Sequence, residues 1–360
     1  MPAVLPQTWF ADQQWFLLLI FTVIAMVALI KGADWLVEGA SGLAYRFGMP
    51  KIIVGATIVS LGTTSPECAV SVMAAWGGEP GLALGNAVGS IIADTALIFG
   101  VGCVITVLPA DRFVLSRQGW VQFGSALLLA GLCYFAFAQQ GDAAQIDRWM
   151  GIVLLGLLAG YMFISVKWAR QHKFGEPFIE PNGDAETTDE TESTKHEDSL
   201  AMLIGMIVLG LAIVIVSSDA LVQSVGELAF QWGVPKVVIA ATLVAFGTSL
   251  PELVVGITSI RKGHAELLVG NVIGADVLNV LFVIGASAVA KPLPVIDQSA
   301  KVPEIFLYLH LPAMLVILLL FRGFIFSAVK KEKFSRWMGW PLLALYVAYS
   351  VSQYVISVGK

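Results

Sequence analysis

Charged residues are scarce in this sequence. Only 13% of its 360 residues are Asp, Glu, Lys or Arg, whereas soluble domains carry roughly 25%. Apolar residues make up 57%. A chain of this length and composition cannot hide its apolar surface in one core, so it requires lipid as its solvent. The formal net charge of −5 also argues against nucleic acid as a partner.

Cysteine and histidine are also few. The three cysteines, Cys68, Cys103 and Cys133, lie in apolar stretches without a CxxC or Cys/His spacing. Neither a disulfide framework nor a zinc site is therefore expected. The four histidines fall in loops or near the ends of apolar segments. We expect no tightly bound cofactor.

Long apolar segments occupy most of the chain. Each is near or above the roughly 20 residues needed to cross the hydrocarbon core. They predict an all-α integral membrane protein with ten transmembrane helices. The segments span residues 15–45, 50–76, 81–108, 117–138, 149–168, 200–231, 235–260, 265–290, 303–322 and 336–358.

Lysine and arginine predict the orientation of these spans, because cytoplasmic loops are enriched in both. With ten spans and the N-terminus outside, fifteen basic residues fall on the inner side and five on the outer side, with Lys31 inside the first span. This distribution predicts that both termini lie outside. The absence of organellar signals points to a plasma membrane, most simply a bacterial inner membrane.

An acidic stretch separates two halves of the chain. Residues 170–199 carry nine Asp and Glu among Thr, Ser, Pro and Gly, a composition typical of a solvated linker. We expect a first five-helix repeat at 1–169, a cytoplasmic linker at 170–199 and a second repeat at 200–360.

The two halves repeat at a single offset of 185 residues. Matched pairs include Asp34 and Asp219, and Glu67 and Glu252. Each half has five predicted spans, so the second half starts on the opposite side of the membrane. The repeats are therefore expected to be inverted, an arrangement in which transporter sites lie near the midplane.

The most specific motif occurs once in each half, at Ser60–Glu67 and Ala245–Glu252, as Gly-Thr-x-x-Pro-Glu. Proline removes a backbone donor and crowds the carbonyl one turn earlier, and glycine weakens the helix further. We expect a break that frees carbonyl oxygens near 60–63 and 245–248. Such groups are tolerated in lipid only when buried in protein or lining a cavity.

A glutamate in the middle of a membrane span is costly, by a few kcal/mol even on insertion scales. Two glutamates occur at matched positions, Glu67 and Glu252. This match favours a shared function over kinked helices whose glutamates are merely protonated or paired internally.

A second matched segment reads Gly-Asn-x-x-Gly. Asn86, Ser90 and Asp94 lie four residues apart, so they share one helix face. Asn271 and Asn279 occupy the equivalent face in the second half, with Ala275 between them. These candidate ligands, like the glutamates, are oxygen donors, which suit calcium, magnesium, manganese or sodium.

At these residues the sequence resembles the sodium/calcium exchanger family of the calcium/cation antiporter superfamily. The paired segments look like the two alpha repeats of that family, and the resemblance extends over both halves. It implies ten spans in an inverted 5+5 arrangement.

The resemblance also implies individual roles. Glu67 and Glu252 would be the central calcium carboxylates, joined by Thr63 and Thr248. The other implied ligands are the hydroxyls of Thr64, Ser249 and Ser90 at positions associated with sodium, the backbone carbonyls of Ser60 and Ala245, and the pair Asp94 and Asn279.

Two departures from the family pattern concern the counter-ion. Ala275 stands where the family often has a hydroxyl, which weakens one sodium position. Asp276 lies about 100° away from the ligand face and ranks below the other candidates. Glu67, Glu252 and Asp94 would hold three negative charges, which three sodium ions, or one calcium ion and one proton, would neutralise.

The sequence therefore predicts a secondary active antiporter for inorganic cations, most simply calcium against sodium by alternating access. A proton-coupled calcium or manganese exchanger of the same fold is the nearest alternative. A cation channel is disfavoured because no separate polar stripe lines a pore. An intramembrane protease using Asp94 and Asp276 is disfavoured because the repeat pairs Asp94 with Asn279. The protein is not expected to be an enzyme, and its oligomeric state stays open.

Overall fold

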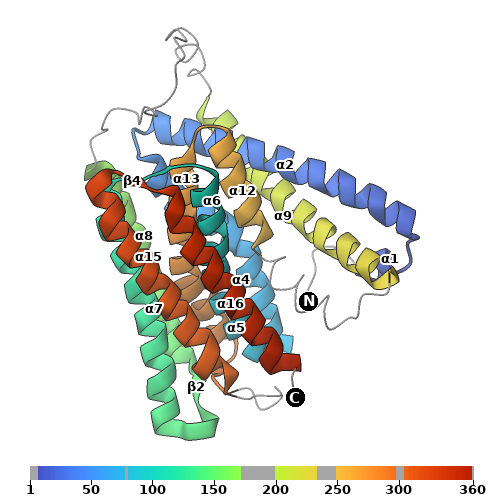
Figure 1. Ribbon diagram of the computed structural model, residues 1–360, viewed down its shortest axis with the longest axis vertical. Coiled ribbons are helices and arrows are strands. Elements are labelled where there is room, and N and C mark those ends of the chain that lie inside the picture. The colour runs from blue at the N-terminus through green and yellow to red at the C-terminus, as the bar shows by residue number, and fades with distance from the viewer. Residues whose placement is uncertain (1–6, 78–79, 172–198, 233–248, 297–303, 359–360) are drawn as a thin grey trace.

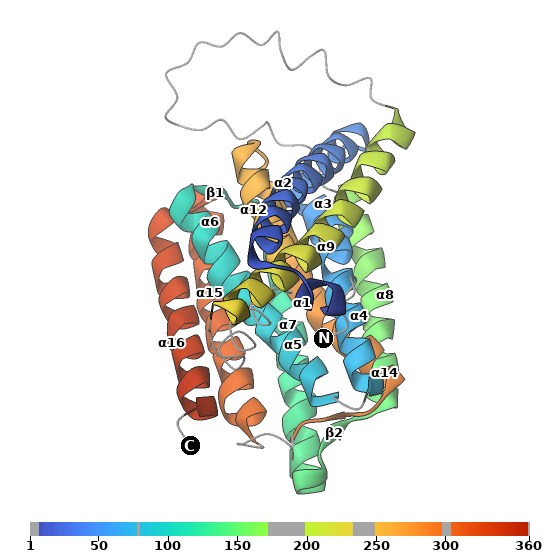
Figure 2. The same cartoon turned by 90° about the vertical axis from the view of Figure 1, so that its right-hand side faces the viewer.

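The computed structural model describes residues 7–77, 80–171, 199–232, 249–296 and 304–358. These residues form a bundle of steep helices crossed obliquely on one side by two long helices, α2 and α9 (Figures 1 and 2). The elements of the first half are α1 (Gln7–Ala11), α2 (Trp15–Arg46), α3 (Lys51–Val54), η1 (Gly55–Val59), α4 (Ser60–Gly77), α5 (Pro80–Ile92), η2 (Ala93–Ile98), α6 (Phe99–Ile105), β1 (Leu108–Pro109), α7 (Arg112–Gln140), η3 (Gly141–Ala143), β2 (Gln145–Ile146) and α8 (Arg148–Gln171).

The second half repeats this order as far as it is described. Its elements are α9 (Leu200–Gln231), α12 (Leu250–Arg261), α13 (Ala265–Leu278), η5 (Asn279–Ile284), α14 (Gly285–Ala290), β3 (Leu293–Pro294), η6 (Phe306–His310), α15 (Leu311–Lys331), β4 (Lys333–Phe334), η7 (Arg336–Met338) and α16 (Gly339–Val358). The predicted acidic linker falls almost wholly outside the described residues, because α8 ends at Gln171 and the description resumes at 199.

Eight helical stretches of the described residues are long and apolar enough to cross a membrane. They span Trp15–Arg46, Lys51–Gly77, Pro80–Ile105, Arg112–Ala143, Arg148–Gln171, Leu200–Gln231, Ala265–Ala290 and Phe306–Lys331. The span predicted at 235–260 lies mostly outside the described residues, and α16 occupies the tenth predicted segment. An all-α membrane protein is confirmed, and the number ten stays a prediction.

The matched motifs lie on the innermost helices. Within its most apolar window, Ala265–Ala290 is 94% buried, whereas α2 and α9 are each 28% buried. The outer helices expose large apolar side chains such as Ile24, Phe163 and Val208, as expected for surfaces that face lipid.

The helices α2 and α9 show the repeat most directly, because shifting the bounds of α2 by 185 residues gives those of α9. They pack antiparallel: Thr22 donates a hydrogen bond to Ser224 at 3.1 Å, and Gly39 lies against Ile207. The 185-residue shift converts Thr22 into Ile207 and Gly39 into Ser224. The two contacts are therefore related by a two-fold exchange of the halves.

Two short ribbons join the halves at opposite ends of the bundle (Figures 1 and 2). In one, β1 pairs antiparallel with β4, and in the other β2 pairs antiparallel with β3. Each half therefore contributes one strand to each ribbon. The strand β3 is also β1 shifted by 185 residues.

The expected helix break at 60–63 is wrong. The helix α4 runs continuously from Ser60 through Pro66, and the irregular segment is the π-helix η1 just before it. Pro66 still leaves the carbonyl of Gly62 without its usual donor, since proline has no N–H. In the second half, Pro251 stands in the first turn of α12, where a missing N–H costs least.

Candidate cation-binding site

Glu67 lies on α4 at the centre of the bundle and has no exposed surface. The hydroxyl of Ser90, on α5, donates a hydrogen bond of 2.7 Å to Glu67 Oε1. Ser249 and Asn279 from the second half lie next to the same carboxyl group. Its other oxygen, Oε2, has no hydrogen-bond partner among the described residues. The predicted ligands Glu67 and Ser90 therefore meet, and one carboxylate oxygen is left open.

Glu252 occupies the equivalent place in the second half, in the first turn of α12. It is fully buried, and within the described part of the chain neither carboxyl oxygen accepts a hydrogen bond. Thr63 of the first half lies beside it, and the hydroxyl of Ser249 is likewise buried without a partner there. Each glutamate thus faces residues of the opposite repeat.

Asp94 is the second residue of the π-helical segment η2, and Asn279 is the first residue of the π-helical segment η5. Both side chains have no exposed surface, and none of their polar side-chain atoms is hydrogen-bonded within the described ranges. Asp94 interacts electrostatically with Glu67 and Glu252. Leaving such buried acceptors unpaired costs about 1–3 kcal/mol each, and more when they are charged.

The hydroxyl of Thr63 contacts polar groups of both halves. Thr63 lies 3.4 Å from both the carbonyl of Ser60 and the side-chain oxygen of Asn271. The hydroxyl of Thr64 is fully buried and has no partner in the described region. The predicted ligands Thr63, Ser60 and Asn271 therefore lie together in the interior, and the neighbouring Thr64 is buried as well.

Three predicted ligands are not seen in contact with these groups among the described residues. Asn86 is only partly buried, and it donates to the hydroxyl of Ser71 at 3.1 Å. Thr248 and Ala245 lie outside the described residues.

The carboxyl groups do not form a metal cluster on their own. No three His, Cys, Asp or Glu side chains within the described residues converge closely enough to hold one metal ion. A cation bound here would therefore draw on hydroxyl, amide and backbone oxygens beside Glu67 and Glu252. Such mixed oxygen shells suit hard cations.

A polar cluster that the sequence ranked low lies beside the site. Asp276 on α13 accepts hydrogen bonds from Thr95 on η2 and from Gln122 on α7. Gln118 and Gln122 are buried polar residues one turn apart in an apolar helix. This pair of glutamines in an apolar segment was the sequence feature that could have indicated the polar cluster.

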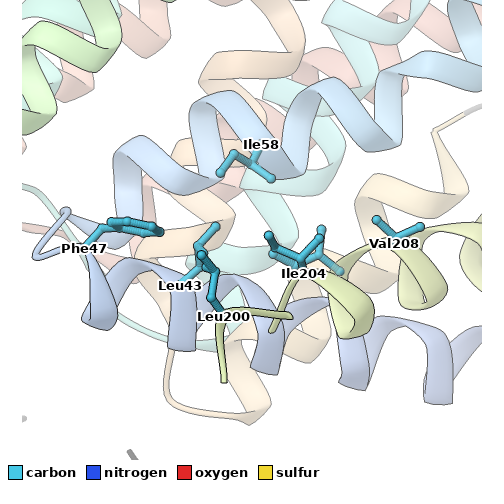
Figure 3. Close-up of a pocket in the computed structure, with 7 residues that line it drawn as sticks. Leu43, Phe47, Ile58, Leu200, Ile204 and Val208 are labelled. Atoms are coloured by element: carbon cyan, nitrogen blue, oxygen red, sulfur yellow. The ribbon is translucent and has the colours of Figure 1, made fainter. Parts of the chain in front are cut away.

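One pocket of the described residues is not an ion site. It has a volume of about 410 Å³ and lies between α2, η1 and the start of α9 (Figure 3). Only apolar side chains line it: Leu43, Phe47, Ile58, Leu200, Ile204, Ile207 and Val208. With no oxygen or nitrogen ligand, it offers nothing to a cation.

Comparison with known proteins matches both halves. The family described as "Sodium/calcium exchanger protein" matches residues 17–167 and again 202–355. Sodium/calcium exchanger MaX1 of Methanosarcina acetivorans is 30% identical over 356 residues, which cover 93% of this chain and 97% of that protein. Inner membrane protein YrbG of Escherichia coli is 31% identical over 272 residues, or 75% and 79% of the two chains.

A solved structure gives the same result. The sodium-calcium exchanger NCX_Mj, soaked with Na⁺ and Sr²⁺, matches with a TM-score of 0.74 at 25% identity, over 94% of this chain and 99% of that chain. Together with the matched buried carboxylates, these similarities mean that this chain belongs to the sodium/calcium exchanger family.

Proposed function

We propose that this multi-pass cation antiporter exchanges calcium for sodium by alternating access. One observation carries the proposal: Glu67 and Glu252 are equivalent in the repeat, fully buried, and surrounded by oxygen atoms that lack hydrogen-bond partners within the described residues. An interior of this kind is costly without a cation to complete it.

The chemistry of the cluster favours calcium as one cargo. Calcium takes 6–8 oxygen ligands in flexible geometry. Glu67 Oε2, both oxygens of Glu252, the hydroxyls of Thr64 and Ser249 and the carboxylate of Asp94 provide such oxygens from both repeats. Thr248 and Ala245 complete the proposed ligand set by the repeat.

The proposed architecture is ten spans in two inverted five-helix repeats. The antiparallel packing of α2 on α9 and the exchanged strands of the two ribbons support it. We place both termini outside and the acidic linker in the cytoplasm, as the distribution of basic residues predicts. We further propose that the membrane is a bacterial inner membrane. The pair α2 and α9 is proposed to slide across the inner helices and expose the site to one side at a time.

Sodium is the proposed counter-ion, although the two halves are not equal in this respect. Ser90 contributes a hydroxyl next to Glu67, whereas Ala275 is fully buried and contributes none. The number of carboxylates in the interior favours a proton-coupled calcium or manganese exchanger as the second candidate, because protons can neutralise the negative charge that the bound metal ion leaves.

Uptake of calcium into proteoliposomes tests these proposals. Vesicles are loaded with sodium, or given a pH gradient without sodium, and calcium entry is measured. Sodium-dependent uptake is expected. Uptake that follows only the pH gradient would mean that protons, and not sodium, are the counter-ion. An ion conductance that exceeds carrier turnover and needs no counter-ion would indicate a channel.

Two substitutions test the site itself. Glu67→Gln and Glu252→Gln keep side-chain volume and remove a charge, so each should abolish uptake under both gradients. Asp142→Asn, at an exposed carboxylate of η3, is the matched control and should transport normally. Normal uptake by either glutamine variant would refute the assigned site.

A further inference from the structure

The side chain of Asp276 is held in place from two directions. It lies on α13 with 1% of its surface exposed. Its Oδ2 atom accepts a hydrogen bond from the hydroxyl of Thr95 and one of 2.6 Å from the side-chain amide of Gln122. Gln122 itself lies 3.5 Å from the Thr95 hydroxyl. Three elements, α13, η2 and α7, thus fix one oxygen of this carboxylate.

The other oxygen is left open. Asp276 Oδ1 is buried and finds no hydrogen-bond partner within the described ranges. No lysine or arginine of the described residues forms an ion pair with Asp276. The buried Arg322 is directed elsewhere, since it donates to the carbonyl of Leu115 at 3.3 Å and lies 4.2 Å from the ring of Trp120. A charged carboxylate in this position requires a positive charge that the described residues do not supply.

The ionisable groups around Asp276 increase this requirement. Asp94 on η2 interacts with it electrostatically, and Glu67 on α4 and Glu252 on α12 lie around Asp94. From α7 the group that faces Asp276 is the neutral Gln122. Lys51 contacts α13 only at its start, through His264, about 18 Å along the helix axis from Asp276. The carboxylates therefore have no fixed counter-charge at this depth among the described residues.

This arrangement is formed by both halves and occurs once. The 185-residue shift places Ile91 opposite Asp276 and Val280 opposite Thr95. The symmetry-related positions therefore carry neither the carboxylate nor the threonine hydroxyl of this cluster. The cluster is therefore not a requirement of the helix packing.

We infer that Asp276 is a fourth carboxylate of the transport cycle, whose charge is balanced by one additional monovalent cation, a sodium ion or a proton, carried in each turnover. Thr95 and Gln122 position this carboxylate and do not themselves carry the charge. The inference rests on the proposed exchange of calcium, and it concerns how many monovalent ions accompany that exchange.

The distribution of calcium at equilibrium tests this inference, because it depends on stoichiometry and not on rate. Proteoliposomes holding the full chain are brought to zero net calcium flux at a series of sodium gradients at constant pH, and then at a series of pH gradients at constant sodium. The slope of log calcium ratio against log sodium ratio, or against the pH difference, counts the coupled ions. For Asp276→Asn we expect one of the two slopes to fall by one, which means about a tenfold smaller calcium ratio at a tenfold gradient.

The two gradients identify the ion. A lower slope against sodium identifies sodium, and a lower slope against pH identifies a proton. Thr95→Val keeps the carboxylate and should retain both wild-type slopes. Slopes equal to those of the wild type in Asp276→Asn under both gradients would overturn the inference. Absence of calcium exchange in the wild type would instead refute the proposed function.

A second measurement serves if Asp276→Asn exchanges too slowly. Addition of calcium to the detergent-solubilised full chain displaces monovalent ions, which a sodium electrode and a pH indicator count. The wild type should release one more ion than Asp276→Asn, and equal release would overturn the inference without any turnover.

Discussion

Replacing Gly210 by alanine perturbs a close backbone approach between α2 and α9. A Cβ atom at this position would lie 2.6 Å from the amide nitrogen of Leu36 and 2.7 Å from the carbonyl oxygen of Gly32. Both are backbone atoms, which cannot rotate away. Ordinary contacts begin near 3.4 Å, so the two helices must separate locally by roughly 0.8 Å, and small residues at membrane helix interfaces exist to permit such approach.

Overpacking of this kind costs about 1–3 kcal/mol. Gly205→Ala is a matched control on the same helix, because a Cβ there meets no atom within 4 Å. Both variants gain the same helix propensity, about 1 kcal/mol, so their difference isolates the contact. Thermal unfolding of both variants in one detergent should show Gly210→Ala to be less stable by about 1–3 kcal/mol. A Gly210→Ala protein as stable as Gly205→Ala would refute the packing argument.

Two further predictions concern Lys262 and His264, which lie between the helices α12 and α13. Lys262 donates to Glu38 at 2.6 Å and lies 3.5 Å from Asp34, but all three side chains are at least a quarter exposed. Lys262→Met should therefore destabilise the fold by less than about 1 kcal/mol, and the effect should vanish in high salt, as thermal unfolding at two ionic strengths would show. Burial, and then the ammonium of Lys51, lower the pKa of His264 from 6.5 to about 4. Below pH 6.5 the unfolded chain binds a proton at His264 that the folded chain does not bind. The free energy of unfolding should therefore decrease as the pH is lowered from 6.5 to 4, by less than about 1.4 kcal/mol per pH unit. Unfolding across this range should show no such contribution in His264→Gln, and an identical pH profile in both proteins would contradict the assignment.

The features that the sequence predicted well are local or periodic. Apolar length located the eight candidate spans of the described residues, and one constant offset matched Glu67 with Glu252. That offset also anticipated the equivalent bounds of α2 and α9. These predictions succeed because a membrane imposes length and polarity on each helix separately.

The π-helical segment η1 could not be predicted in this way, because it depends on contact with α13. A Cβ on Gly55 would lie 2.6 Å from the carbonyl oxygen of Leu267, so η1 and α13 pack backbone to backbone. No window of sequence around Pro66 contains this partner. The same holds for Asp276, since its partner Gln122 is 154 residues away in the chain, and a helical wheel of α13 alone directs Asp276 away from the ligand face.

The two ribbons have a consequence for the biosynthesis of the protein. The strand β1 pairs with β4, which is synthesised about 224 residues later. At about 5–20 residues per second, β1 waits roughly 10–45 seconds for its partner, and β2 likewise waits for β3. The first half thus enters the membrane with an unpaired strand at each end. Its final assembly is therefore a late event, which must wait for strands of the second half.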